Sequence, residues 1–461
     1  MIPVTLLRGV GPSGRDERIL MGPEWVAILG LVAVFVIGTV LPINMGALGF
    51  VAAWLVGVYS LGLVTDDIIA GMSGSLILTI VGVTYLFAIA RDNGTVDLIV
   101  ATAVRGVGGR VVLIPWVMFA VTGALTAIGA LSPAACAIIG PIALGFAGRY
   151  GISPLMMGMM VVHGAQAGGF SPISIYGTIT NSVMASAGLP NSELTIFFAS
   201  LVVNTVFAAA LFFTLGGPSL ASRRIDPEPE HEDDRSSGSG GTATATARRT
   251  EQETKKRPMV SVKTQQIITL LVFVVVAVLA LAFEQDIGFV TITAAVLLCM
   301  IAPERSANAV RNIAWPTVLL VAGVSCYAFI LVEAGSPEFV GNWAAGLGVA
   351  ALGALVLCYV GGVVSAFASS TALLPVIIPI AVPLITDGGV SAAFTVAAVA
   401  VSSTIVDVSP FSTNGALMLA NKPDTIAEPV YYKQILTYGA IVTAVGPLLV
   451  WAALVLPGWG T

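Results

Sequence analysis

Long apolar stretches separated by short polar segments dominate this chain of 461 residues. One helix needs about 20 consecutive apolar residues to cross the hydrocarbon core of a bilayer. Runs of that kind recur along both halves of the chain. We therefore predict membrane-spanning helices at 24–43, 46–64, 72–91, 193–216, 264–283, 287–303, 315–334 and 434–457.

Four further apolar regions, at 110–149, 152–182, 349–386 and 391–421, are interrupted by glycine, proline and hydroxyl residues. The first and the third carry a polar break in the middle, at Gly129–Pro133 and Ser365–Thr371. Each of these two regions fits a re-entrant hairpin, in which two half-length helices enter and leave the membrane on the same side. Such irregular backbone is tolerated at membrane depth only where protein covers it or it lines a cavity.

The two halves of the chain share landmarks at a constant spacing. Pro141 corresponds to Pro379 and Ser171 to Ser409, with the same sequence offset in both pairs, and both serines begin a Ser-Pro-x-Ser motif. This correspondence indicates an internal repeat. Five spanning helices plus one hairpin give each half an odd number of crossings, which inverts the second half relative to the first.

The predicted fold is an all-α polytopic membrane protein with two inverted repeats and discontinuous helices. A tail (1–23) precedes the first repeat, and a linker (217–263) has the Pro, Ser, Gly, Thr and mixed-charge composition of a disordered segment. The first repeat (24–216) contains scaffold helices 24–109, the hairpin 110–149, the broken helix 152–182 and the helix 193–216. The second repeat (264–457) contains scaffold helices 264–348, the hairpin 349–386, the broken helix 391–421 and the helix 434–457. The stretches 93–109 and 335–348 are expected to be interfacial helices.

The basic residues provide a check on this topology. All of the 20 Lys and Arg residues except Arg8, Arg15 and Arg18 fall on one side of the predicted membrane, many of them in the linker. The positive-inside rule makes that side cytoplasmic. We therefore expect a multi-pass protein of the inner (plasma) membrane, surrounded by membrane lipid, with a cytoplasmic linker and extracytoplasmic N- and C-termini.

The composition excludes several classes of function. The chain is 57% hydrophobic and 10% charged, whereas soluble domains carry about 25% charged residues, so no basic face for nucleic acid is expected. Two histidines and four cysteines without a CxxC pair argue against a transition-metal site. GxxxxGK[ST], HExxH and GxSxG motifs are missing from the sequence. We expect a protein that is not an enzyme and that uses no cofactor beyond a coupling ion, Na⁺ or H⁺.

The interrupted helices predict a site for an anion and a cation near the membrane midplane. Half-helix N-termini suit an anion, and unwound carbonyls and hydroxyl oxygens suit a small cation such as Na⁺. Because no Lys or Arg falls at membrane depth in this topology, dipoles, hydroxyls, amides and a co-bound cation would hold the anion. Asp407 fits equally a cation ligand, a proton carrier or a helix cap. His163 fits a structural hydrogen bond better than a proton relay.

Short motifs at the hairpin tips and helix breaks carry a resemblance to a known family. Ser369–Thr371 matches an SNT hairpin-tip signature with Ser in place of Asn, whereas the first tip, Leu131–Pro133, departs from it. Gly177–Asn181 resembles a Gly-Thr-Pro-x-Asn break, and Ser409–Asn414 occupies the corresponding place in the second half. In these features the chain resembles the malonate/C4-dicarboxylate carriers of the MatC type, in the ion-transporter superfamily that includes the divalent anion:sodium symporters. The likeness covers 24–216 and 264–457.

The resemblance implies a secondary transporter of small dicarboxylates such as malonate, malate or succinate, coupled to a cation, with Na⁺ preferred. It also implies a homodimer in which hairpins and broken helices form a transport domain that moves, as an elevator, against a dimerising scaffold. The candidate cation-binding residues are Thr126, Gly129, Ser132, Ser365, Ser369, Ser370 and Asp407. The candidate substrate-binding residues are Ser132, Ser171, Ser174, Thr178, Ser370, Thr371, Ser409, Pro410, Ser412, Thr413 and Asn414.

Two other functions stay open at the level of sequence. A Na⁺/H⁺ antiporter or an arsenite-type efflux permease of the same superfamily is favoured by the titratable Asp407 and His163. An anion channel would result if the broken helices formed a continuous pore. The hydroxyl-rich pair of hairpins favours the dicarboxylate carrier, and the sequence leaves the particular dicarboxylate, the ion and its stoichiometry, and the direction of flux undetermined.

Overall fold

The computed structural model describes residues 22–41, 43–106, 110–223, 262–283, 285–303, 308–345, 350–366 and 370–459. Every regular element within these ranges is a helix, and no strand occurs among them. Most of the predicted N-terminal tail and of the predicted linker lies outside the described residues.

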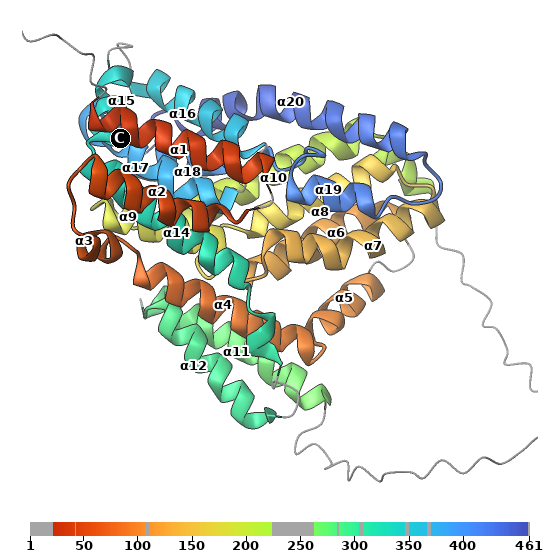
Figure 1. Cartoon of the computed structure of the whole chain (residues 1–461). Coiled ribbons are helices and arrows are strands. Elements are labelled where there is room, and N and C mark those ends of the chain that lie inside the picture. The colour runs from red at the N-terminus through yellow and green to blue at the C-terminus, as the bar shows by residue number, and fades with distance from the viewer. Residues whose placement is uncertain are drawn as a thin grey trace, which may run out of the picture.

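The helices of the first half lie in the predicted apolar segments and are separated by short turns (Figure 1). They are α1 (Pro23–Val40), α2 (Met45–Tyr59), α3 (Thr65–Ala70), α4 (Gly74–Asp92), α5 (Thr95–Arg105), η1 (Val111–Leu113), α6 (Ile114–Ala127), α7 (Ser132–Tyr150), α8 (Pro154–Gly168), α9 (Ile175–Ser186), α10 (Glu193–Thr214) and η2 (Gly217–Ser222).

The second half repeats this order of long, short and interrupted helices. Its elements are α11 (Val262–Ala282), α12 (Ile287–Ile301), η3 (Ala309–Asn312), α14 (Trp315–Glu333), α15 (Ser336–Ala345), α16 (Ala350–Ser365), α17 (Ser370–Gly388), α18 (Ala392–Ile405), α19 (Thr413–Ala420) and α20 (Glu428–Leu454). Among the described residues, seven helices are long and apolar enough to cross a membrane.

Two helix boundaries differ from the sequence prediction. α2 ends at Tyr59 rather than near residue 64, because the chain turns at Gly62, whose φ of +70° suits glycine, and then forms the short helix α3. α20 starts at Glu428, before the predicted 434, because Pro429 occupies its first turn, where the missing N–H costs no helical hydrogen bond.

Two helix pairs, each joining one half of the chain to the other, pack through glycine. α2 lies against α14, where a side chain on Gly46 would overlap the Leu319 carbonyl and one on Gly323 would overlap the Gly46 carbonyl. α4 lies against α12, where a side chain on Gly82 would overlap the Thr291 hydroxyl. Close packing of this kind drives helix association in membranes, where the hydrophobic effect between helices is lost. The α2–α14 and α4–α12 contacts therefore pack the two halves of the chain closely against each other.

The contacting helices α4 and α14 run in opposite directions. The Asn312 amide, just before α14, donates to both carboxylate oxygens of Asp92, the last residue of α4, at 3.1 and 3.2 Å. At the other end, the Phe329 ring near the end of α14 packs on Gly71, just before α4. The start of each helix thus lies beside the end of the other.

The remaining helices form a second group around two buried ones. α8 is buried along nearly its whole length and packs on α6, α7 and α10, and α18 is equally buried against α16, α17 and α20. α10 also contacts α18, so that both halves share one core. α4, α11 and α12 form one edge of the molecule, below this group in Figure 1.

We predict that Gly323→Val lowers the melting temperature of the purified protein. The added side chain must push α14 away from the Gly46 carbonyl, and overpacking of this kind costs about 1–3 kcal/mol. The matched control is Gly145→Val on α7, where a Cβ would meet no atom within 4 Å. Equal thermal stability of the two variants in detergent would contradict the role of this contact.

Candidate functional site

The turns that interrupt the two broken helices are built from serine. Between α8 and α9, the Ser174 hydroxyl donates to the Ser171 carbonyl at 2.7 Å. Between α18 and α19, the Ser412 hydroxyl donates to the Ser409 carbonyl, also at 2.7 Å. Each carbonyl also accepts the backbone N–H of the same serine, at 2.9 and 3.1 Å, so backbone and side chain close each turn together.

Each break is also tied to the hairpin helix of its own half. The Ser171 hydroxyl donates to the carbonyl of Ala127, the last residue of α6, at 2.5 Å. The Ser409 hydroxyl donates to the carbonyl of Ala366, directly after α16, at 3.2 Å. Ser171 and Ser409, which stand at equal offset, therefore both bond a carbonyl at the end of the preceding helix in their own half, although the two accepting carbonyls lie one residue away from that offset.

Glycine is required at one position of each break. A side chain on Gly177, near the start of α9, would overlap the Ser171 carbonyl, and one on Gly415, near the start of α19, would overlap the Ser409 carbonyl. The sequence offset between these glycines equals the offset between the two serines. Backbone can approach this closely only where no Cβ stands in between.

The tip of the first hairpin meets the broken helix of the second half. Ser132, the first residue of α7, accepts a hydrogen bond from the Asn414 side-chain amide at 2.8 Å. The same amide donates to the Asp407 carboxylate at 2.9 Å. A hydroxyl, an amide and a carboxylate from both halves of the chain thus form one buried contact.

The tip of the second hairpin meets the broken helix of the first half in the same way. Tyr176 on α9 lies near Ser370 and Thr371, which begin α17, and the two helices pack against each other. Tyr176 is the second residue of α9, as Asn414 is the second residue of α19, and these two residues also stand at the offset of the repeat. The two tip contacts are therefore equivalent under the repeat.

Both tip contacts belong to one cluster around Asp407. This carboxylate interacts electrostatically with the Tyr176 hydroxyl on α9 and with the Cys136 thiol on α7. The starts of α7 and α19 therefore lie beside each other, as do the starts of α9 and α17, with Asp407 near both pairs. We call this group the tip cluster, defined as Ser132, Tyr176, Ser370, Thr371, Asp407 and Asn414.

The tip cluster is buried and contains neither lysine nor arginine. Its most exposed member, Asp407, is only 7% exposed, and Asn414 is fully buried. The Asn414 side-chain oxygen has no hydrogen-bond partner among the described residues. A buried polar atom without a partner is costly, so this oxygen marks a place for a ligand or an ion.

The remaining predicted residues divide into three groups. Ser365 bonds Ser370 side chain to side chain at 2.8 Å and so supports the second tip. Thr126 instead donates to carbonyls of its own helix, at 3.1 and 3.2 Å, and Thr413 is exposed, so the structure brings neither into the tip cluster. The others are Gly129, in the turn after α6 with a φ of +108°; Pro410, half-buried in the second break; and Ser369, outside the described residues.

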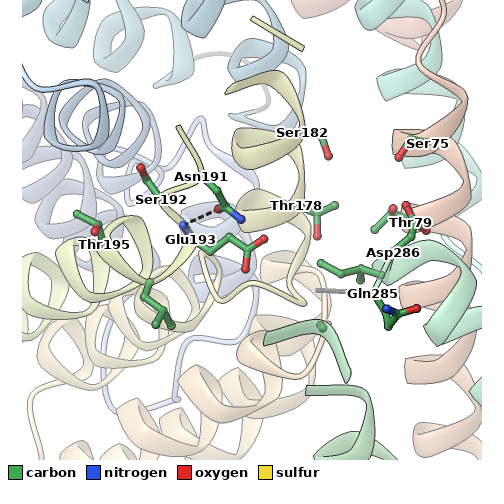
Figure 2. Close-up of a pocket in the computed structure, with 13 residues that line it drawn as sticks. Ser75, Thr79, Thr178, Ser182, Asn191, Ser192, Glu193, Thr195, Gln285 and Asp286 are labelled. Carbon is green, nitrogen blue, oxygen red and sulfur yellow. Dashed lines mark hydrogen bonds between the residues drawn. The ribbon is translucent and has the colours of Figure 1, made fainter. Parts of the chain in front are cut away.

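Thr178 lines a polar cavity (Figure 2). Its hydroxyl donates to the Ser174 carbonyl at 2.7 Å, and its side chain lines this cavity of about 520 Å³ between α9, α10 and the edge formed by α4, α11 and α12. The cavity contains the carboxylates of Glu193 and Asp286 and several hydroxyl and amide groups. The other polar lining residues are Ser75, Thr79, Ser182, Asn191, Ser192, Thr195 and Gln285.

His163 has a structural environment away from the tip cluster. Its Nδ1 pairs with the Asn204 side-chain oxygen at 2.9 Å and its Nε2 with the Tyr438 hydroxyl at 2.6 Å. Both ring nitrogens are therefore occupied, and the ring links α8 to α10 and α20. This arrangement favours the structural interpretation of His163 over a proton relay.

Tyr176 and Cys136 were missed by sequence reasoning. Cys136 lies in an apolar run, where small buried residues are common. Tyr176 could have been found, since it stands at the repeat offset from Asn414. That signal is visible only when both halves are aligned residue by residue, because the two side chains differ in type.

Comparisons with known proteins agree with this geometry. Residues 21–169 match the family model described as the N-terminus of the dicarboxylate carrier protein MatC. The resemblance to the MatC carriers is confirmed over this segment. It spans α1 to α8, including the first hairpin tip at Ser132. No curated protein matched the chain.

Two solved transporter structures share the fold. The Alcanivorax borkumensis YdaH transporter superposes with a TM-score of 0.58 at 14% identity, over 95% of this chain and 99% of that one. Neisseria gonorrhoeae MtrF, whose structure is described as illuminating a class of antimetabolite efflux pumps, gives 0.54 at 11% identity, over 95% and 96%. The chain therefore has the helical fold of these two multi-pass transporters, and its first third matches a dicarboxylate carrier family.

Proposed function

We propose that this protein is a secondary active transporter of small dicarboxylates, of the malonate, malate and succinate class, coupled to Na⁺. The observation that carries the proposal is the placement of four helix N-termini around the buried tip cluster. Each N-terminus contributes roughly half a positive charge. An anion is the ligand that such a site stabilises.

The arrangement of the N-termini suits a substrate with two carboxylates. The starts of α7 and α19 meet through Ser132 and Asn414, and the starts of α9 and α17 meet through Tyr176 and Ser370. These are two separate pairs of positive helix ends, one for each carboxylate. Without a lysine or arginine in the cluster, the substrate would be held by dipoles and hydroxyls and could be released without breaking an ion pair.

The first tip also offers oxygens for a cation. Ser132 supplies a hydroxyl, Asp407 a carboxylate and Asn414 an amide oxygen that lacks a partner. Oxygen ligands of this kind suit a hard cation. A cation at this point would offset the negative charge of Asp407 and of the substrate, which is how binding of the two would be coupled.

Alternating access would follow from two inverted repeats with re-entrant hairpins at 110–149 and 349–386. The opposite directions of α4 and α14 and the equivalent tip contacts support this architecture. In our proposal α6–α10 and α16–α20 form the transport domain of an elevator. The glycine-packed pairs α2–α14 and α4–α12 belong to the scaffold of a homodimer. The cavity at Thr178 lies between the two parts and would give access to the site.

The nearest alternative is a cation antiporter, which the buried carboxylate of Asp407 favours. The two functions differ in whether a dicarboxylate crosses the membrane.

We also propose that the protein lies in the inner membrane, with the linker in the cytoplasm and both termini on the other side. This orientation rests on the distribution of the basic residues alone.

We predict that proteoliposomes containing the full chain accumulate labelled malonate or succinate when a Na⁺ gradient is imposed. Preloading with unlabelled substrate should accelerate uptake by counterflow, because a carrier returns loaded faster than empty. Empty liposomes are the control. Absence of counterflow together with Na⁺/H⁺ exchange would identify an antiporter, and single-channel conductance steps would identify a channel.

We further predict that Ser370→Ala and Ser409→Ala weaken the substrate affinity by about tenfold or more, since each removes a hydroxyl near a charged ligand. The measurement is the rise in melting temperature against a concentration series of malonate, succinate and citrate, with and without Na⁺. Ser186→Ala, an exposed serine at the end of α9, is the matched control. Parent-like responses of both site variants to every ligand would show that the site is placed wrongly.

A further inference from the structure

The two tip contacts occupy equivalent places in the repeat but differ in chemistry. At the first tip, Asn414 bridges the Ser132 hydroxyl and the Asp407 carboxylate. At the second tip, the offset of the repeat makes Tyr176 the equivalent of Asn414 and Gly169 the equivalent of Asp407. One contact thus contains a carboxylate and an amide, and the other contains neither.

The first contact has the oxygens of a cation site. The Asn414 amide nitrogen lies 2.8 Å from the Ser132 hydroxyl and 2.9 Å from an Asp407 oxygen, and its own oxygen has no partner among the described residues. Rotating this amide by half a turn exchanges its oxygen and nitrogen, which have nearly the same shape. Three oxygens, one of them charged, would then face the same point, as a small hard cation requires.

The second contact is already filled. The Ser370 hydroxyl is bonded to the Ser365 hydroxyl at 2.8 Å and donates to the Ser403 carbonyl at 3.3 Å, and Tyr176 lies beside it. The Tyr176 ring lies so close to Gly169 that a Cβ there would be 2.8 Å from the ring, and Phe170 packs against it with ring centroids 5.5 Å apart. Position 169 therefore carries no carboxylate to bind a cation and leaves no room for one to be added.

We propose that the transporter carries one coupling Na⁺ per substrate, bound by Ser132, Asp407 and Asn414, while Tyr176 occupies the equivalent second site. The inference rests on the proposed function and specifies its coupling. It assigns Tyr176 as a positioning residue that holds the second hairpin tip without an ion. A transporter with two such symmetric tips would otherwise be expected to bind two cations.

The charge of the loaded cluster agrees with a single cation. Four helix N-termini contribute roughly two positive charge equivalents. Asp407 and a dicarboxylate dianion together bring three negative charges, which leaves the loaded cluster with about one negative charge. One monovalent cation brings it close to neutral, the state in which crossing the low-dielectric membrane costs least.

This stoichiometry has an electrical consequence. One Na⁺ and one dianion carry a net negative charge across the membrane in each cycle. An inside-positive potential should therefore accelerate uptake, and an inside-negative potential should slow it. With two Na⁺ per dianion the cycle would be electroneutral. With three Na⁺ it would carry a net positive charge, and an inside-negative potential would accelerate uptake.

The test uses the full chain in proteoliposomes, with labelled succinate and radioactive sodium at a pH where succinate is a dianion. We expect a Na⁺-to-succinate uptake ratio of about one and a Na⁺ Hill coefficient of about one. Potentials clamped with K⁺ and valinomycin should give faster uptake when the inside is positive. The inference would be overturned by a Na⁺-to-succinate ratio near two, by an uptake rate that does not change with the membrane potential, or by uptake that does not depend on Na⁺.

Asp407→Asn tests the assigned ligand. It should weaken the apparent Na⁺ affinity by about tenfold or more, because a charge-assisted contact is lost, and so lower succinate uptake at low Na⁺ concentration. Asp424→Asn, an exposed carboxylate outside the cluster, is the matched control and should behave as the parent. Unchanged Na⁺ dependence in Asp407→Asn would contradict the site. If the variant does not fold, the Na⁺-to-succinate ratio and the potential dependence of the parent protein still test the inference.

The same experiments separate the inference from the proposed function. If the parent shows no succinate uptake or counterflow, the dicarboxylate function fails and the single-cation inference falls with it. If the parent shows counterflow but a different Na⁺ ratio, the function stands and only the inference fails. Tyr176→Phe adds a further readout: it should leave the Na⁺ ratio at about one and lower the substrate affinity.

Discussion

A helix that ends inside a membrane leaves backbone N–H groups that no water can satisfy, and this constraint governs the structure. The starts of α7 and α19 are joined by hydroxyl, amide and carboxylate side chains, the starts of α9 and α17 pack on each other, and the Ser412 hydroxyl caps α19. An unsatisfied polar group costs several kcal/mol in hydrocarbon. The positive ends of these helices therefore favour a negatively charged ligand at this buried place.

Two contacts at the tip cluster join the two halves of the chain. Ser132 of the first half reaches Asn414 of the second, and Ser370 of the second half faces Tyr176 of the first. Each half on its own would leave its hairpin tip without a partner. The shared core of α8, α10 and α18 also crosses between the halves, so the helices around the tip cluster form one packed group.

Much of this fold could be predicted from the sequence because membranes impose simple rules. The apolar runs located the helices, and Gly, Pro and Ser located the breaks, since each breaker has a direct backbone effect. The offset of Ser171 and Ser409 predicted equivalent positions, and both bond a hairpin carbonyl. What could not be predicted was the pairing across halves, because contacts between Ser132 and Asn414 depend on how two distant helix ends are packed. Likewise Thr126 was assigned to the site from its place near a break, but its hydroxyl bonds within its own helix.

In the proposed mechanism, substrate and cation bind at the starts of α7, α9, α17 and α19. A cryo-EM structure of the full chain with succinate and Na⁺ tests it directly. We expect density for a dicarboxylate between the paired starts of α7 and α19 and of α9 and α17, with a single ion beside Asp407. Substrate density elsewhere, with the tip cluster unchanged and closed, would contradict the account.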